Sequence, residues 1–254
     1  MMVNAEQLQI KSYANASEQA ARQQMGDLLF QNPIPPDQLL SNLGLFLESK
    51  HLARLLFMDF LYRQIIAVQG VVMEFGVRWG QNLALFSALR GIYEPFNRHR
   101  KIVGFDTFSG FPSIHEKDGQ SNMMVNGQLA VSPHYEDTLQ QLLSLHETLN
   151  PLNHIKKHEL CIGDVVEELP QYLARCPETI VAMAYFDLDL YEPTVKCLEL
   201  LRPRMTKGTI LGFDELNDPD SPGETLALME VFGLNHLKIQ RFPFASRVSF
   251  VVFE

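Results

Sequence analysis

Five short apolar runs, each ending in polar residues, alternate with helix-like segments between residues 71 and 215. This alternation restricts the possible folds more than any other feature of the chain. The runs are Val71–Val77, Lys101–Asp106, His158–Asp164, Thr179–Asp187 and Gly208–Glu215. Strands that alternate with helices form right-handed βαβ units, which build a parallel sheet covered by helices on both faces. The sequence therefore predicts an α/β, Rossmann-like fold.

The end of the chain follows a different pattern. Two strand-like segments, Lys238–Phe244 and Arg247–Phe253, are separated only by Ala245 and Ser246. So short a connection favours a β-hairpin, in which neighbouring strands run antiparallel. We therefore expect a mostly parallel sheet closed by a C-terminal antiparallel hairpin.

The N-terminal residues differ in composition from the rest. Residues 1–45 are polar and contain a proline-rich break at Asn32–Gln38, which a helix cannot cross. Apolar residues then recur at helical spacing from Leu43 to Ile66. We predict an N-terminal arm or helical cap over residues 1–45 and one main domain over residues 46–254, entered through this helix.

Charge and cysteine content restrict the partners and the compartment. The formal net charge of −9 argues against a nucleic-acid-binding surface and favours a small-molecule partner. Cys161, Cys176 and Cys197 are too scattered for a disulfide framework, and we expect buried thiols. No signal peptide and no apolar run of about 18 residues is visible. We expect a soluble, cytoplasmic protein that does not bind membranes.

The first strand ends in Glu74, Gly76 and Gly80. The two glycines allow the tight turn and the close backbone approach that a nucleotide-like ligand needs, or they form a plain strand-to-helix turn before a helix starting near Gln81. Their spacing differs from GxGxxG, so a dinucleotide-binding loop is poorly supported. Glu74 is an acid within an apolar strand, where an unpaired carboxylate is costly.

The second and third strands also end in acids. Asp106 can accept hydrogen bonds from both hydroxyls of a ribose, or it can cap the following turn through the amides of Thr107 or Phe108. Asp164 can face an adenine amino group or cap the next helix. Both alternatives remain open for each residue.

Carboxylates gather at the ends of the fourth and fifth strands. Asp187 and Asp189 follow one, and Asp214 and Glu215 follow the other. Like charges so close together repel unless a cation neutralises them, and hard oxygen ligands suit Mg²⁺. We predict that Asp187, Asp214 and Glu215 bind the metal and that Asp189 supports the loop; helix-capping or solvated acids are the alternative.

Six segments appear in a specific order: EFGVRWGQN, GFDTFSGFP, GDVVEELP, FDLDLYEPT, LRPRMTKGTILGFDEL and the closing hairpin. With this order and spacing, the chain from Leu52 to Glu254 resembles the TylF or macrocin O-methyltransferase family of class I S-adenosylmethionine-dependent methyltransferases. These are Mg²⁺-dependent enzymes that methylate sugar hydroxyls, including those on macrolides. The resemblance implies the same fold, cofactor and metal here.

The resemblance also assigns roles to individual residues. It implies that Glu74 and Gly76 lie in the cofactor turn, that Asp106 faces the ribose and that Asp164 lies near adenine. Family members that methylate sugars use a histidine base from the loop after the second strand, whereas this chain reads SNMMVNG there. His115 and His134 flank the loop and are the candidate bases.

The main hypothesis is therefore an S-adenosylmethionine- and Mg²⁺-dependent O-methyltransferase that acts on a sugar or glycosylated metabolite. A noncatalytic binding protein with the same fold and a nicotinamide-dependent oxidoreductase are the alternatives. The missing GxGxxG and the closing hairpin count against the oxidoreductase. The N-terminal arm and the family resemblance both predict a homodimer or a larger homo-oligomer.

Overall fold

The computed structural model describes residues 14–254, in which seven strands form one sheet. They are β1 (Val71–Phe75), β2 (Ile102–Asp106), β3 (His158–Ile162), β4 (Val181–Phe186), β5 (Met205–Phe213), β6 (Gln240–Arg241) and β7 (Ser249–Val252). The order is β3-β2-β1-β4-β5-β7-β6, and β1 to β5 are parallel. The predicted α/β fold is confirmed.

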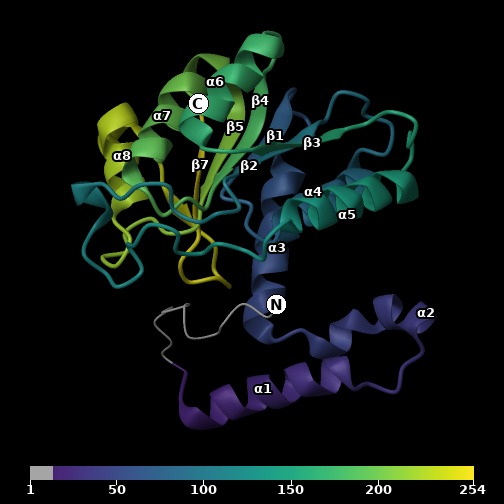
Figure 1. The fold of residues 1–254 in the computed structure, drawn as a ribbon. Coiled ribbons are helices and arrows are strands. Elements are labelled where there is room, and N and C mark those ends of the chain that lie inside the picture. The colour runs from purple at the N-terminus through teal and green to yellow at the C-terminus, as the bar shows by residue number, and fades with distance from the viewer. Residues whose placement is uncertain (1–13) are drawn as a thin grey trace.

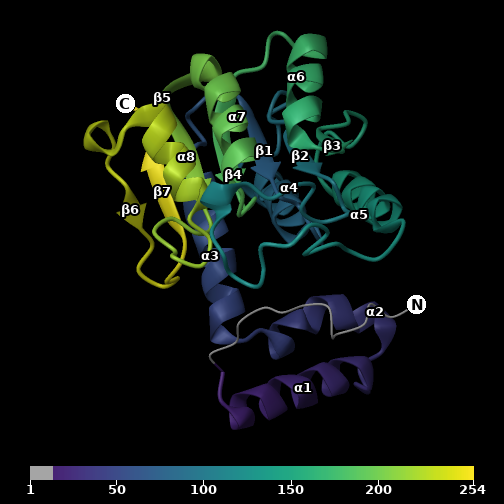
Figure 2. The ribbon, with the colours of Figure 1, turned by 60° about the vertical axis from the view of Figure 1, so that its left-hand side comes forward.

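Helices cover both faces of this sheet (Figures 1 and 2). One face carries α3 (Ser49–Gln64), α4 (Gln81–Tyr93) and α5 (Tyr135–Leu149), and the other carries α6 (Val165–Arg175), α7 (Tyr191–Leu201) and α8 (Gly223–Phe232). Every residue of the central strands β1 and β4 is buried, as expected for strands enclosed on both sides. The two faces thus hold two separate apolar cores.

The C-terminal strands confirm the predicted antiparallel hairpin but correct the length of its connection. Strand β7 pairs antiparallel with both β5 and β6. The predicted two-residue connection is wrong, because β6 ends at Arg241 and β7 begins only at Ser249. Phe242 and Val248, inside the longer connection, are buried in the core beside α3, so the chain leaves the sheet to pack against that helix.

The N-terminal segment projects away from the sheet in both views (Figures 1 and 2). It contains α1 (Ala16–Phe30), α2 (Pro36–Leu39) and a 3-10 helix at Leu40–Phe46, and none of these elements has a buried residue. Arg22 of α1 donates a hydrogen bond to Glu48, directly before α3. The helix predicted from Leu43 begins only at Ser49, because Leu40–Phe46 forms a separate 3-10 helix. Residues 1–13 of the predicted arm lie outside the described residues.

Cys161 and Cys197 are buried as predicted, whereas Cys176 is partly exposed at the end of α6. Within residues 14–254, no helix has both the length and the apolarity needed to cross a bilayer.

The strand order reverses between β1 and β4, since β2 and β3 extend to one side of β1 while β5 extends to the far side of β4. In open α/β sheets, ligands bind outside the carboxyl ends of the strands at such a reversal. The fold alone therefore points to the ends of β1, β2 and β4 as the functional site.

A buried ion pair fixes the opposite, amino-terminal edge of the sheet. Arg100 donates hydrogen bonds to Glu94 and to the backbone carbonyls of Ile65, Val68 and Gly70. Burial alone would raise the pKa of Glu94, but the hydrogen bonds from Arg100 and Asn97 outweigh it, so this pKa is lowered. The pair ties the end of α3 to the start of β2.

Glu94→Gln should lower the free energy of unfolding by about 3 kcal/mol at neutral pH, since it leaves the guanidinium of Arg100 buried without its counter-charge. A carboxyl whose pKa is lowered by folding stabilises the fold above its unfolded pKa, and this contribution is lost as the pH falls through the folded value. The difference between wild type and variant should therefore shrink below about pH 4. Urea unfolding at both pH values measures it.

Glu199→Gln is the matched control, because Glu199 is exposed on α7. Its effect should stay within about 0.5 kcal/mol at both pH values. An equal effect of the two substitutions would contradict the structural role given to Glu94.

Candidate functional site

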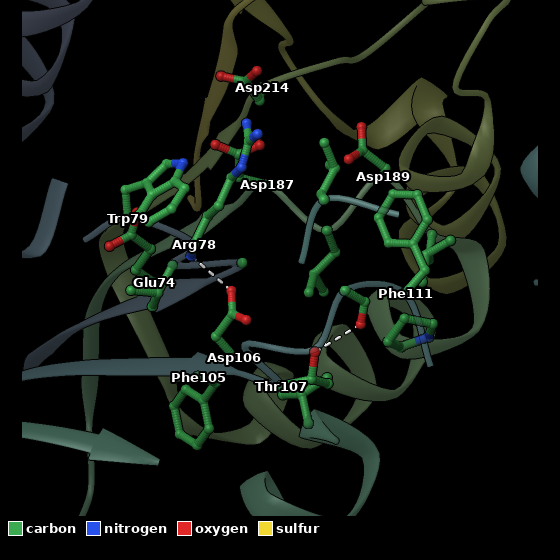
Figure 3. Close-up of a pocket in the computed structure, with 18 of the residues that line it drawn as sticks. Glu74, Arg78, Trp79, Phe105, Asp106, Thr107, Phe111, Asp187, Asp189 and Asp214 are labelled. Carbon is green, nitrogen blue, oxygen red and sulfur yellow. Dashed lines mark hydrogen bonds between the residues drawn. The ribbon is translucent and has the colours of Figure 1, made fainter. Parts of the chain in front are cut away.

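A cavity of about 420 Å³ opens at the carboxyl ends of β1, β2, β4 and β5 (Figure 3). This volume lies within the range of small-molecule binding sites. Its wall includes every residue predicted to bind a cofactor or a metal, namely Glu74, Gly76, Asp106, Asp164, Asp187, Asp214 and Glu215. The structure therefore brings together side chains that are up to 141 residues apart, from Glu74 to Glu215 (215 − 74 = 141).

The turn after β1 depends on two glycines. Gly76 has a φ of 88°, and a Cβ there would lie 1.8 Å from the backbone oxygen of Asp187. Gly80 has a φ of 77°, and its Cβ would meet the side chain of Leu139. Both glycines line the cavity, so the ligand-admitting turn and the plain strand-to-helix turn that the sequence allowed both remain possible. Gly76 thus lets β1 and β4 converge below the cavity.

Glu74 is buried within β1 and faces the cavity (Figure 3). Its Oε1 accepts a hydrogen bond of 2.7 Å from the Asn82 amide, whereas its buried Oε2 has no hydrogen-bond partner among residues 14–254. Burial raises the pKa of Glu74 well above its ordinary value. An unpartnered buried oxygen is costly, so this position is suited to receive a donor from a ligand.

Asp106, at the end of β2, organises the same turn. Its carboxylate accepts hydrogen bonds from the backbone amides of Arg78, at 2.7 Å, and Phe108, at 2.6 Å. Figure 3 shows it at the centre of the cavity wall. Each carboxylate oxygen has two lone pairs, so both can still accept bonds from ribose hydroxyls. The capping and ribose-binding alternatives are therefore compatible.

Asp164 caps the following helix. Its side chain accepts a hydrogen bond of 2.9 Å from the Val166 amide at the first turn of α6. The residue nevertheless lines the cavity beside Gly163. The capping alternative is thus present in the structure, while contact with an adenine remains a prediction.

Asp187 and Asp214 emerge side by side, because β4 and β5 pair in register up to Phe186 and Phe213. Figure 3 shows both at one end of the cavity. The pKa of Asp187 is raised to about 8, first by loss of solvent and then by the charge of Asp214, although Arg54 acts in the opposite direction. The predicted juxtaposition of the two acidic strand ends is therefore present.

A basic residue that the sequence analysis did not single out spans these two acids. Arg54 of α3 donates through Nη2 to Asp187 at 2.7 Å and through Nη1 to Asp214. It lies three, four and seven residues before Phe57, Met58 and Leu61, which are all buried. That spacing places Arg54 on the buried face of α3, and it is the signal that could have identified the residue.

The remaining acids surround the loop after β4. Asp189 is buried in a left-handed conformation with a φ of 62°, and no described residue forms a hydrogen bond with its Oδ1. Its pKa is raised well above the ordinary value, first by burial and then by the interaction with Glu215. Glu215 itself pairs with Arg247, while its buried Oε2 has no partner in the described part of the chain. Glu224 of α8, which sequence reasoning missed, accepts the Leu188 amide at 2.9 Å and supports the loop.

The acids do not enclose a metal position in this conformation. Within the described residues, no group of three or more His, Cys, Asp or Glu side chains is arranged to hold a metal ion. The hard oxygen donors and the unpartnered Glu215 Oε2 have the chemistry of a Mg²⁺ site. Their arrangement differs from that of a metal site, because the guanidinium of Arg54 lies between Asp187 and Asp214.

Neither candidate histidine is part of the cavity wall. His115 caps a 3-10 helix at Glu116–Asp118, and its ring lies 5.1 Å from that of Tyr191. His134 is the residue before α5 and has a φ of 63°. Both histidines thus lie at the start of short or long helices, and neither lines the cavity that contains the acids at the strand ends.

The loop between β2 and α5 covers one side of the cavity with Phe111, Met123 and Leu129. It is attached to the acidic loop through Asp118, a buried residue that the sequence analysis did not select. Asp118 accepts hydrogen bonds of 2.6 Å from the backbone amides of His115 and Tyr191. One carboxylate therefore joins the covering loop to the first turn of α7.

Asp118→Ala should leave both amides without their acceptor and loosen the covering loop. Amide hydrogen exchange within residues 107–133, measured by mass spectrometry, should become about tenfold faster, which corresponds to a loss of about 1.4 kcal/mol. Glu116→Ala is the matched control, because Glu116 is exposed in the same short helix. Unchanged exchange in the Asp118 variant would rule out this attachment.

Comparison with solved structures shows two close matches. A crystal structure described as CalS11, a calicheamicin methyltransferase, is 44% identical in sequence, with a TM-score of 0.93 over 95% of each chain. An apo structure of CalS11, described as a TDP-rhamnose 3'-O-methyltransferase of calicheamicin biosynthesis, is 42% identical, with a TM-score of 0.84 over 95% of this chain and 96% of that one.

A third structure, of the O-methyltransferase NovP, is 20% identical with a TM-score of 0.60 over 79% of each chain, and it supports the fold alone. No protein-family model and no curated protein sequence matched this chain. Only the two CalS11 structures among these three exceed 40% identity, and both match nearly the whole length of this chain.

Proposed function

The chain belongs to the class I S-adenosylmethionine-dependent O-methyltransferases, the family of CalS11, and we propose that its methyl acceptor is a sugar hydroxyl. The observation that carries this proposal is the 44% identity with a calicheamicin methyltransferase over 95% of both chains. A nucleotide-linked sugar of the TDP-rhamnose type is the first acceptor to test, since CalS11 is described as a TDP-rhamnose 3'-O-methyltransferase.

S-adenosylmethionine would occupy the part of the cavity near β1 and β2. Asp106 would accept the ribose hydroxyls, and the unpartnered Oε2 of Glu74 would accept a donor from the amino-acid portion. Asp164 lines the wall beyond Asp106 and would lie near adenine. This placement leaves the end of the cavity at Asp187 and Asp214 for the acceptor.

We further infer that Asp187, Asp214 and Glu215 hold Mg²⁺. The support is their oxygen-donor chemistry, the buried Glu215 Oε2 that has no partner among the described residues, and the pKa of Asp187, which is raised first by burial and then by the charge of Asp214. When bound, the ion would act as a Lewis acid toward the acceptor oxygen and would help to orient it. The protein's own contribution is to exclude water and to fix the approach of the acceptor toward the methyl group.

Asp187→Asn and Asp214→Asn should each abolish metal-dependent turnover and leave the affinity for S-adenosylhomocysteine within a few fold. The reason is that the acids lie at the acceptor end of the cavity, away from Asp106. Turnover with S-adenosylmethionine and TDP-rhamnose, together with calorimetric titration of S-adenosylhomocysteine, measures both quantities.

Asp106→Ala is the matched control with the opposite pattern. It should weaken S-adenosylhomocysteine binding by at least about tenfold, or 1.4 kcal/mol. Binding of Mn²⁺, used as a probe in place of Mg²⁺, should be retained. Full activity of either asparagine variant would contradict the metal assignment. Failure of the wild-type protein to bind S-adenosylhomocysteine would instead favour the noncatalytic alternative.

The proton of the acceptor hydroxyl requires a base within reach of the cavity. No histidine of the described residues lines that cavity, whereas Asp189 does, with a buried and unpartnered Oδ1. Its raised pKa makes it a stronger base than an ordinary carboxylate once it is ionised. We therefore assign proton removal to Asp189 in place of His115 and His134.

Asp189→Asn should lower kcat by a factor of about 10² to 10⁴ while binding of S-adenosylhomocysteine and Mn²⁺ changes only a few fold. The wild-type rate should rise with pH as the carboxyl ionises, and this rise should disappear in the variant. A pH profile of kcat measures it. Glu192→Gln, at an exposed position on α7, should behave as wild type. A variant at Asp189 with normal kcat would exclude this residue as the base.

A further inference from the structure

Arg54 connects the main domain's first helix to both acidic strand ends. Its two terminal nitrogens bind separate acids, Nη2 to Asp187 Oδ2 and Nη1 to Asp214 Oδ1, so one guanidinium bridges β4 and β5. The hydroxyl of Tyr185 donates to the same oxygen of Asp214 at 2.8 Å, and Arg54 lies 5.9 Å from the Tyr185 ring. This geometry places a positive charge between the two acids.

The same two acids are the ones that would hold the divalent cation. A planar guanidinium that donates to two carboxylates neutralises part of their charge and occupies the directions in which their lone pairs point. Glu215, the third acid, is held separately by Arg247. Each acid of the proposed metal site is thus already paired with an arginine, and the acids enclose no metal position in this conformation.

A change of the Arg54 rotamer would not require α3 to move. Its side chain is 28% exposed and forms part of the cavity wall, so there is free volume beside it. The guanidinium is held by side-chain contacts that a rotamer change would release. The fully buried residues of α3, such as Phe57 and Leu61, continue to anchor the helix when Arg54 rotates.

We propose that Arg54 and a divalent cation bind Asp187 and Asp214 in mutually exclusive states, so that Arg54 serves as the site's internal cation until the metal replaces it. This inference rests on the proposed metal site. It follows that the metal affinity is set by the difference between the free energies with which the metal and Arg54 bind the two acids. Both contacts of Arg54 must be broken before the metal can bind.

The experiment measures Mn²⁺ binding to the full-length protein in the absence of cofactor and acceptor, with free Mn²⁺ followed by electron paramagnetic resonance. Arg54→Met removes the competing charge and retains an extended side chain, so we expect at least tenfold tighter Mn²⁺ binding than in wild type. Arg54→Lys keeps a charge without the bidentate fork and should give an intermediate affinity. In EDTA the Met variant should have a lower Tm, and Mn²⁺ should raise its Tm more than that of wild type.

Arg63→Met is the matched control, since Arg63 lies on the same helix with its side chain 63% exposed. Its Mn²⁺ affinity should stay within twofold of wild type.

A second measurement needs no variant at Arg54. Phenylglyoxal modification of Arg54 in the wild-type protein, quantified by mass spectrometry, should accelerate when Mn²⁺ is added.

The possible outcomes separate the two proposals. Equal or weaker Mn²⁺ binding by Arg54→Met, or Mn²⁺-independent modification of Arg54, would overturn the competition while leaving a metal site in place. Binding by the Met variant but not by wild type would support Arg54 as the internal cation and overturn Mg²⁺ as the resident ion. Absence of Mn²⁺ binding in every protein, with Asp187→Asn indistinguishable from the rest, would overturn both.

Discussion

The pairing of β1 with β4 is the contact on which the whole site depends. The strand order reverses there, so the loops after these two strands diverge to opposite sides and leave a cavity between them. Close convergence requires Gly76, because any side chain at that position would collide with the backbone of Asp187. The backbone that carries the first acid is therefore positioned by the absence of a side chain on the neighbouring strand.

That convergence creates an electrostatic problem that the surrounding structure solves locally. Asp189, Asp214, Glu215 and Glu224 are buried at the edge of the sheet, where unpaired charges are costly. Arg54 and Arg247 come from opposite ends of the chain and each pairs with two acids. Asp189 and Glu224 form no ion pair with another described residue, and burial raises their pKa values well above the ordinary range.

The sequence was sufficient to predict the sheet and its acidic edge, because the end of a strand is marked by residues next to one another in the chain. Asp106, Asp187 and Asp214 could be placed at one edge from the apolar runs that precede them, and the structure places all three in one cavity. Arg54 and Asp118 could not be placed in this way, since each acts on residues more than seventy positions away, through contacts that only the packing of α3 and of the covering loop creates. The two candidate histidines lie outside the wall of the cavity, because proximity along the chain to a loop does not fix the direction in which that loop folds.

A metal site built on an arginine-bridged pair of acids differs physically from an open one. In an open site, two neighbouring carboxylates repel and destabilise the fold until an ion arrives, so that folding and metal binding are coupled. Here the bridge from α3 to β4 and β5 provides the compensating charge within the chain, and the sheet edge can form first. If Asp187, Asp214 and Glu215 hold Mg²⁺ as proposed, this internal compensation lowers the affinity for the ion while the cavity is already formed. Mg²⁺ suits such a site because it retains several waters and is bound by few carboxylates.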